Sequence, residues 1–590
     1  MATVSLRFSV RALEADAGLS GTFLAPHSGP RLVGKLRSSR VPADFQRHEV
    51  GPRGEVVHLA ALGLGSGSGP GAGGSSASWV SADEQMRDAR SHPLRSAKRS
   101  EAVASKEPWT ATVYARGQRP DAARRVLASA LQLPRTAVLG RGALHTPGIS
   151  VQLVTFPRGL PTVLQQAQHD GPLVSGLLTG QDPLVAVGAS TLLAPEVDAV
   201  GSTVQDTTSR RQRRGTGPEN WQCQGHSYSV VLRNLSPRQC EAGIVEDGVA
   251  RFATDGFINA FELGDFGLAE VRRYEVGAAL WAGKWDLAAK LLLVMNQADT
   301  NGEGCHSSPA SAAAAAFRSG DLARGVELLP EDGTAEGLRA LALQLLLRRP
   351  ALEALQRAVP KPVWARHLSA VSRLAWSRAA AIRLRQMPHR PMPGDLIWDE
   401  SAGEARALKA DEVDMRRLAD VVLPLPRPGE VVPECPGRLQ MEATLDKLTS
   451  GQADPEVAAF PINVGSLMPR FRHLVCVPSD VSWDIVEAAD GPVVDCDLTK
   501  LIGDEIGTVV RTPEADDTKA TNRRARAGRR SAASGRSGGG SGVSASLRGP
   551  ALRARFTLPR GSSAEAALRE LLHAEASEFC EDLGRRDELF

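Results

Sequence analysis

Apolar residues recur with two different spacings along the chain. Near both ends they alternate with polar residues or form short apolar runs, which predicts β-strands. In the middle they recur every three to four residues, which predicts amphipathic helices. Strands that flank a helix-rich middle predict an α+β domain interrupted by an inserted, mostly helical domain. The predicted strands cover residues 109–114, 149–156, 229–233, 472–477 and 552–558.

Helical spacing returns near the end of the chain. A last helix follows Ser562, whose hydroxyl can cap its first turn. Glu565, Arg569 and Glu570 fall on the face of this helix that we expect to be exposed, because charged residues usually face solvent. The other predicted helices cover residues 121–131, 272–294 with a break at Gly283, 310–346 and 363–385.

Two segments are expected to be tethers or insertions, and a third is a basic cluster in a polar loop. Residues 63–78 are almost wholly Gly, Ser, Ala and Pro, a composition typical of flexible connections. Residues 518–549 combine Gly, Ser and Ala with an arginine cluster at 523–530, and residues 210–214 read Arg-Arg-Gln-Arg-Arg. The two arginine clusters either bind nucleic-acid phosphates in a salt-dependent way or form solvated insertions. The sequence leaves both interpretations open.

Composition limits the classes of function. The chain carries 70 basic and 67 acidic residues, so nucleic-acid binding would depend on a clustered basic face rather than on total charge. The seven cysteines include no C-x-x-C pair, which indicates reduced thiols inside the cell and predicts no zinc site. No run of about 18 apolar residues occurs, and the N-terminus lacks a secretory h-region. We therefore expect neither a membrane span nor a secretory signal.

Short motifs of glycine, proline and aromatic residues follow one another in a fixed order over most of the chain. They are Asp44-Phe45 with Glu49, the segment Gly225–Arg233, the segment 256–267, Pro393-Gly394-Asp395, and Phe556 with Leu558-Pro559. In this order they resemble the TruD family of pseudouridine synthases, which isomerise uridine within RNA. Each motif alone is weak, and their shared order carries the resemblance.

The resemblance implies a fold and a division into domains. We expect an α+β fold: a TruD-type catalytic domain with a mostly antiparallel sheet, interrupted by a helix-rich inserted TRUD domain. The expected parts are residues 1–62 and 109–268 of the catalytic domain, a flexible insertion at 63–108, the inserted domain at 269–467, and residues 468–590 of the catalytic domain with a disordered Arg/Gly/Ser insertion at 518–549.

The resemblance also implies a site. The family reaction breaks the N-glycosidic bond of uridine, turns the uracil and joins it to the ribose through carbon, without a cofactor. It needs a flipped-out nucleotide and a carboxylate beside the ribose. Tyr228 and Phe261 either stack on a base or pack in the core. The implied pocket for RNA and uridine contains His226, Tyr228, Asn259, Phe261 and Phe266.

The family carboxylate aligns with a histidine in this chain. In the family element G-x-K-D-x-x-A-x-T-x-Q the Asp is catalytic, and here His145 stands at its position and Leu144 at that of the Lys. Imidazole is largely uncharged at neutral pH and differs in shape, so we expect that His145 does not replace a buried carboxylate. Other polar positions of the family site also differ: Lys is replaced by Ala115, Asn by His226 and Arg by Asp265.

Three functions follow from these differences. The first is a working pseudouridine synthase in which His145 or an unaligned acid, such as Asp170 or Asp182, supplies the chemistry. The second is a catalytically inactive RNA-binding pseudoenzyme, and the third is a scaffold that binds RNA weakly because Asp265 replaces an arginine. The replaced polar positions favour lost or severely weakened catalysis. We expect RNA, most directly tRNA, as the partner, a monomer without metal or cofactor, and an intracellular location in nucleus or cytoplasm, with an organelle left open.

Overall fold

The computed structural model describes the residues in and around most of the predicted elements. The predicted helix over 121–131 and the arginine clusters at 210–214 and 523–530 lie outside the described residues. The described residues are 10–24, 31–38, 40–51, 53–59, 109–117, 148–156, 185–192, 223–241, 243–267, 271–295, 309–329, 336–399, 401–451, 469–497, 499–500 and 548–579.

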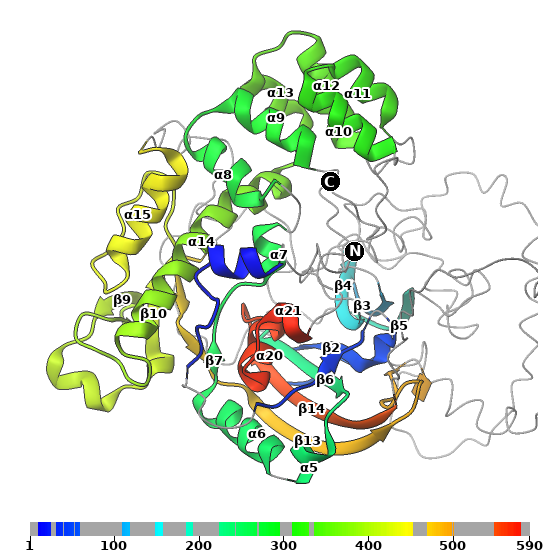
Figure 1. Cartoon of the computed structure of the whole chain (residues 1–590), viewed down its shortest axis with the longest axis vertical. Helices are drawn as coiled ribbons and strands as arrows, with labels where there is room; N and C mark the ends of the chain where they lie inside the picture. Colours follow the sequence, from blue (N-terminus) through cyan, green and yellow to red (C-terminus); the bar gives the residue numbers. More distant parts are fainter. Residues whose placement is uncertain are drawn as a thin grey trace, which may run out of the picture.

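A sheet of eight strands, counted over the described residues, occupies one end of the molecule (Figure 1). Its strand order is β13-β14-β6-β2-β4-β3-β5, with β1 paired to β6. All of its pairs are antiparallel except β2 with β4, so the predicted α+β fold with a mostly antiparallel sheet is confirmed. The strands are β1 Lys35–Leu36, β2 Phe45–Val50, β3 Trp109–Arg116, β4 Ile149–Phe156, β5 Val185–Leu192, β6 Gly225–Arg233, β13 Ser479–Ala488 and β14 Gly549–Pro559.

One strand prediction was wrong. The apolar segment 472–477 is split at Leu474, whose backbone N–H donates to Val421 while its carbonyl accepts from Asn259. The two halves therefore join different sheets, a change of partner that residue spacing does not reveal. They are β11 Phe471–His473, in the sheet β11-β10-β8-β9 with β10 Val421–Pro424, β8 Leu396–Asp399 and β9 Glu404–Ala407, and β12 Val475–Cys476, which pairs with β7 Phe257–Ile258.

The helical middle has its own hydrophobic core, which includes Trp281, Leu292 and Leu341. Gly283 has a φ of +66°, and it separates two helices where the sequence predicts a break. The longest helix, α14, joins this core to that of the sheet, because Val371 belongs to the first and Trp376 to the second. The helices are α8 Arg273–Trp281, α9 Trp285–Met295, α10 Pro309–Ser319, α11 Leu322–Leu328, α12 Glu336–Leu346, α13 Ala351–Ala358, α14 Lys361–Gln386 and α15 Arg438–Thr449 (Figure 1).

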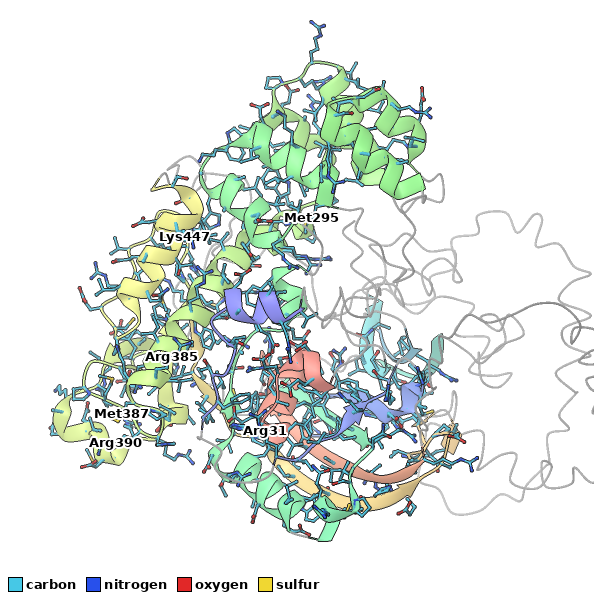
Figure 2. The ribbon with its side chains drawn as sticks, viewed as in Figure 1. Arg31, Met295, Arg385, Met387, Arg390 and Lys447 are labelled. Atoms are coloured by element: carbon cyan, nitrogen blue, oxygen red, sulfur yellow. The ribbon has the colours of Figure 1, made fainter. Side chains whose placement is uncertain are left out.

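The aspartates of two sequence motifs, Asp44-Phe45 and Pro393-Gly394-Asp395, each form a buried ion pair with an arginine. Asp44, at the end of the 3-10 turn Pro42–Asp44, contacts Arg233 of β6, and both side chains are fully buried. Asp395 likewise holds Arg383 at the end of α14, again with both side chains fully buried. Arg385 and Arg390, near the same helix end, are exposed (Figure 2). Loss of one partner of a buried Arg–carboxylate pair strongly destabilises a protein, because the other charge stays buried without a counterion. We therefore infer that these aspartates have a structural role.

The last predicted helix is present, but its cap and its exposed face were predicted wrongly. Helix α20, Ala564–Leu572, is capped by Ser563, whose hydroxyl accepts from the N–H of Ala566. Arg569 is 3% exposed and contacts Glu14 of the N-terminal segment 10–24. Glu565 and Glu570 are partly buried and accept hydrogen bonds from the backbone of residues 263 and 24. Charges on this face are covered by segments that are remote in sequence.

Candidate functional site

Close backbone packing fixes the segment 256–267, which carries most of the predicted pocket. Gly256 has a φ of +80°, and a Cβ there would lie 2.2 Å from the carbonyl oxygen of Cys476. Gly267 has a φ of +86°, and a Cβ there would lie 2.8 Å from the backbone nitrogen of Arg273. Only glycine fits both positions without strain. Between them lie β7 and the short helix α7, Leu263–Phe266.

Asn259 is fully engaged inside the protein. It is 4% exposed; its side-chain Nδ2 donates to the carbonyl of His473 at 3.1 Å. Arg472 donates to the side-chain Oδ1 of Asn259 at 2.9 Å and to its backbone carbonyl at 2.7 Å. Both ends of the amide therefore already have partners, and Asn259 holds the strand segment β11 rather than presenting a free amide.

Phe261 and Phe266 pack within the protein. The guanidinium carbon of Arg472 lies 4.0 Å from the centre of the Phe261 ring, and that of Arg373 lies 5.2 Å from it. Trp376 of α14 meets the same ring edge-on, with 5.5 Å between the ring centres. Phe261 is 8% exposed and Phe266 fully buried. Two guanidinium groups and an indole thus occupy the surroundings of Phe261.

Tyr228 and His226 lie on β6, two residues apart. Tyr228 is 5% exposed and its ring centre lies 5.7 Å from that of Phe45 and 5.6 Å from that of Phe556. Burial and the nearby charge of Arg47 lower the pKa of His226 to about 3, which leaves a neutral imidazole at physiological pH. The two rings lie 6.2 Å apart. Tyr228 therefore packs in the core, and the histidine near it is neutral.

The structure brings three carboxyl groups together here, and the sequence did not reveal that they lie near one another. Asp265 is 5% exposed and forms an ion pair with Arg373. Glu262 accepts a hydrogen bond from Ser563 at 3.2 Å, and burial together with the charge of Asp265 raises its pKa to about 7. Burial and the charge of Glu262 raise the pKa of Glu565 to about 8. The sequence did contain a signal for Glu262. The segment 256–262 resembles the TruD-family motif G-F-(I/P)-N-Y-(Y/F)-G, and Glu262 stands at the position of the last glycine of that motif.

The aligned catalytic position is not among the described residues. His145 and Leu144 lie within 118–147, outside the described part of the chain. Ala115 is fully buried on β3, opposite Ser150 of β4. Ser150 and Gln152, which keep polar positions of the family element, are 8% and 2% exposed, and their side-chain polar atoms have no hydrogen-bond partner among the described residues. Unsatisfied buried amides are costly, so these two side chains call for a partner.

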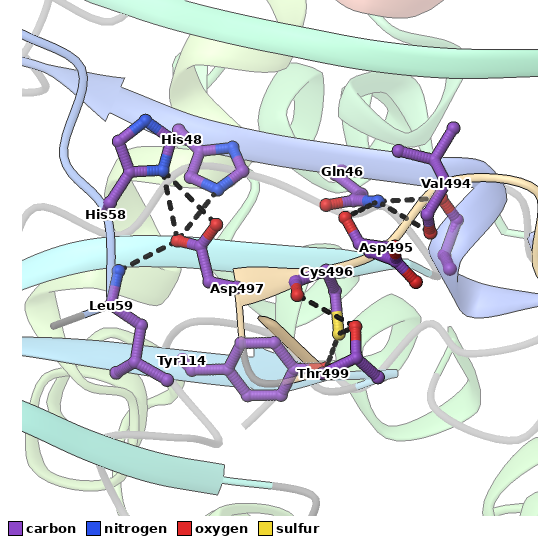
Figure 3. A network of polar contacts seen from close by, with 11 residues as sticks. Gln46, His48, His58, Leu59, Tyr114, Val494, Asp495, Cys496, Asp497 and Thr499 are labelled. Carbon is purple, nitrogen blue, oxygen red and sulfur yellow. Dashed lines mark hydrogen bonds and ion pairs between the residues drawn. The ribbon is translucent and has the colours of Figure 1, made fainter. Parts of the chain in front are cut away.

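Two groups of described side chains could hold a metal ion. In one, His48, His58 and Asp497 bring their ligand atoms within 4.8 Å of one another (Figure 3). The other contains Glu49, Cys223 and His226. In the second group burial and the charge of Glu49 raise the pKa of the Cys223 thiol, which opposes formation of the thiolate that a metal requires.

None of the described helices is long and apolar enough to cross a bilayer.

Comparisons with known proteins agree on one family. The sequence model of the family "tRNA pseudouridine synthase D (TruD)" matches residues 208–431. The chain is similar to human "Pseudouridylate synthase 7 homolog", with 24% identity over 358 residues that cover 60% of this chain and 47% of that protein. It is similar to "Multisubstrate pseudouridine synthase 7" of Schizosaccharomyces pombe, with 23% identity over 45% of this chain and 41% of that protein. The matched part spans less than half the length of these curated relatives.

One solved structure can be superposed over almost the whole chain. It is the putative tRNA pseudouridine synthase D from Methanosarcina mazei, with a TM-score of 0.48 and 14% identity, and the match covers 94% of this chain and 96% of that one.

Proposed function

The chain belongs to the TruD family of pseudouridine synthases as a divergent member, and we propose that it binds RNA while the family's conversion of uridine to pseudouridine is lost or severely weakened. Substrate class, partner and domain organisation are part of this proposal. The RNA would be a tRNA, the protein a monomer, and residues 269–467 an insertion in the catalytic domain. The compartment within the cell stays a prediction.

One observation carries the proposal: the predicted pocket residues are already bonded to, or packed against, other groups of the protein. Both ends of the Asn259 amide are bonded, and Arg472 covers the Phe261 ring at 4.0 Å. Tyr228 packs on Phe45 and Phe556. A flipped uridine needs an open aromatic face and free hydrogen-bonding groups, and these residues do not offer them without rearrangement.

Charged and polar groups near the segment 256–267 support binding of RNA. The charges of Arg47 and Arg373 act on Glu262, and Arg373 and Arg472 lie over the Phe261 ring. Ser150 and Gln152 have buried polar atoms that lack a described partner. A ribose and its phosphates offer hydrogen-bond donors, acceptors and negative charge to such groups.

Salt-dependent binding tests the RNA part of the proposal. The full chain would be titrated with an unmodified tRNA transcript at low and at physiological salt. We expect binding that weakens steeply as salt rises, because phosphate contacts release counterions. Absence of binding at low salt would leave only the scaffold that has lost RNA recognition.

A working enzyme is the second candidate, and Glu262 is the observation that favours it. The family reaction needs a carboxylate beside the ribose. Glu262 lies near Tyr228 and Arg47, its pKa of about 7 lets it exist in both protonation states at neutral pH, and only one of its oxygens is bonded to a described residue. It is an unaligned acid in the region where the family pocket lies.

Substitution separates the two candidates. In the working enzyme, Glu262→Gln abolishes pseudouridine formation and Glu565→Gln, a nearby carboxyl group bonded to the Leu263 N–H, leaves it intact. In the inactive protein, neither variant changes a yield that is already at background. Activity that His145→Ala abolishes and Glu262→Gln spares would assign the chemistry to the histidine instead.

A further inference from the structure

We propose that His48, His58 and Asp497 form a binding site for one divalent transition-metal ion, most suitably Zn²⁺. The three residues come from separate parts of the chain: His48 from β2, His58 from the segment that follows it, and Asp497 from the segment after β13 (Figure 3). The proposal is independent of the RNA chemistry, and it differs from the expectation of no metal that the sequence suggested.

Each histidine nitrogen lies from the Asp497 carboxylate at the separation that a tetrahedral ion requires. His48 Nε2 lies 3.2 Å from Asp497 Oδ2, and His58 Nδ1 lies 3.2 Å from both oxygens of the same carboxylate. Ligands bound at about 2.0–2.1 Å in a tetrahedron are separated by about 3.3 Å. The two imidazole rings converge, with 4.9 Å between their centres. An ion could therefore replace the two His–Asp hydrogen bonds without a large movement of the backbone.

The carboxylate is held in place from behind. The backbone N–H of Leu59 donates to Asp497 Oδ2 at 2.8 Å. Such support orients a ligand and leaves its other oxygen available. Neighbouring contacts fix the same segment against the sheet: Gln46 donates to the carbonyls of Val494 and Asp495 at 3.4 Å. Asp497 is thus a preorganised ligand on an anchored segment.

Burial permits entry of an ion from one side. The side chains of His48 and Asp497 are 9% and 4% exposed, whereas that of His58 is 57% exposed. A donor set of two imidazoles and one carboxylate suits Zn²⁺ and similar borderline ions rather than Ca²⁺ or Mg²⁺, which prefer oxygen ligands. With three protein ligands, the fourth position is open to water. The ion would link β2 to the segment that carries Asp497.

Metal titration of the full chain tests the proposal. Protein freed of metal by chelation would be titrated with Zn²⁺ by calorimetry and with Co²⁺ by visible absorption. We expect one ion per chain, a tetrahedral Co²⁺ spectrum, and a higher unfolding temperature in the presence of Zn²⁺, because the ion binds only the assembled site.

Single substitutions locate the ion. His58→Ala removes an exposed ligand and should fold normally, yet lower Zn²⁺ affinity by roughly tenfold or more and remove the thermal shift. His389→Ala, which changes an exposed histidine beyond α14, should alter neither. Unchanged affinity in His58→Ala, or loss of the ion in Cys223→Ala instead, would overturn the proposal.

Discussion

Replacement of Asp44 by Asn should destabilise the large sheet by about 3–5 kcal/mol, because it leaves the charge of Arg233 buried without a counterion. Both side chains are fully buried, and Arg233 donates to the two carboxylate oxygens at 2.5 and 2.9 Å. The same guanidinium donates to the carbonyls of Ala489 and Gly491 at 2.6 and 2.7 Å. These bonds keep Arg233 in position, so it cannot turn toward water when Asp44 is changed.

A pair on the same sheet provides a matched control. Arg553 of β14 and Asp484 of β13 form an equivalent Arg–Asp fork, but their side chains are 32% and 44% exposed. Water screens this pair, so Asp484→Asn should cost at most about 1 kcal/mol. Native-state hydrogen exchange, followed by mass spectrometry, measures the opening free energy of β6 and β14 separately from that of the helices.

A double-substitution cycle identifies the cause of the loss. Arg233→Met removes the stranded charge, so Asp44→Asn combined with Arg233→Met should cost less than the sum of the two single changes, by about 0.5–3 kcal/mol. If Asp44→Asn costs no more than Asp484→Asn, or if the two changes at the buried pair are additive, the ion pair does not hold this part of the sheet.

Three further outcomes follow from the structure. Burial raises the pKa of Glu565 to about 8, so the folded protein keeps a proton that the unfolded chain releases near the ordinary value of 4.5. The free energy of unfolding should therefore fall as the pH rises from 5 to 8. In urea titrations Glu565→Gln should flatten this fall, whereas Glu487→Gln, an exposed control, should leave it unchanged. Arg472→Lys should cost about 2 kcal/mol by the same titrations, because a compact ammonium cannot bond Asn259 twice and also cover Phe261; a cost near zero would contradict the role given to Arg472. Gly256→Ala should lower the urea midpoint more than Gly54→Ala does, since both have positive φ but only the first brings a Cβ against a carbonyl oxygen; equal midpoints would refute the close approach.

Several strands and one helix break could be predicted from the sequence, because the local spacing of apolar residues and glycines determines them. Alternation and short apolar runs identified β3, β4, β6 and β14, and a glycine identified the break between α8 and α9. The failures concern contacts between remote segments. Leu474 changes its hydrogen-bonding partner within one apolar run, and the charged face of α20 is covered by residues from the N-terminal segment. Residue spacing carries no information on either.

Only part of the candidate site could be predicted, because motifs reveal local segments but not the contacts between remote ones. Motif order brought Tyr228, Asn259 and Phe261 into one region, but it did not reveal that arginines from α14 and β11 occupy that region. Asp265, which stands where the family has an arginine, forms an ion pair with Arg373. Glu262 and the group around Asp497 were missed, because their partners lie hundreds of residues away in sequence.

Chemical mapping of pseudouridine in a tRNA incubated with the full chain decides whether this protein binds RNA without modifying it. The measurement would be made with saturating protein, at a salt concentration where binding has been shown, so that lack of product cannot reflect lack of contact. We expect bound RNA with pseudouridine no higher than in the protein-free control. Pseudouridine formed at a defined position, and absent with Glu262→Gln or His145→Ala, would contradict it.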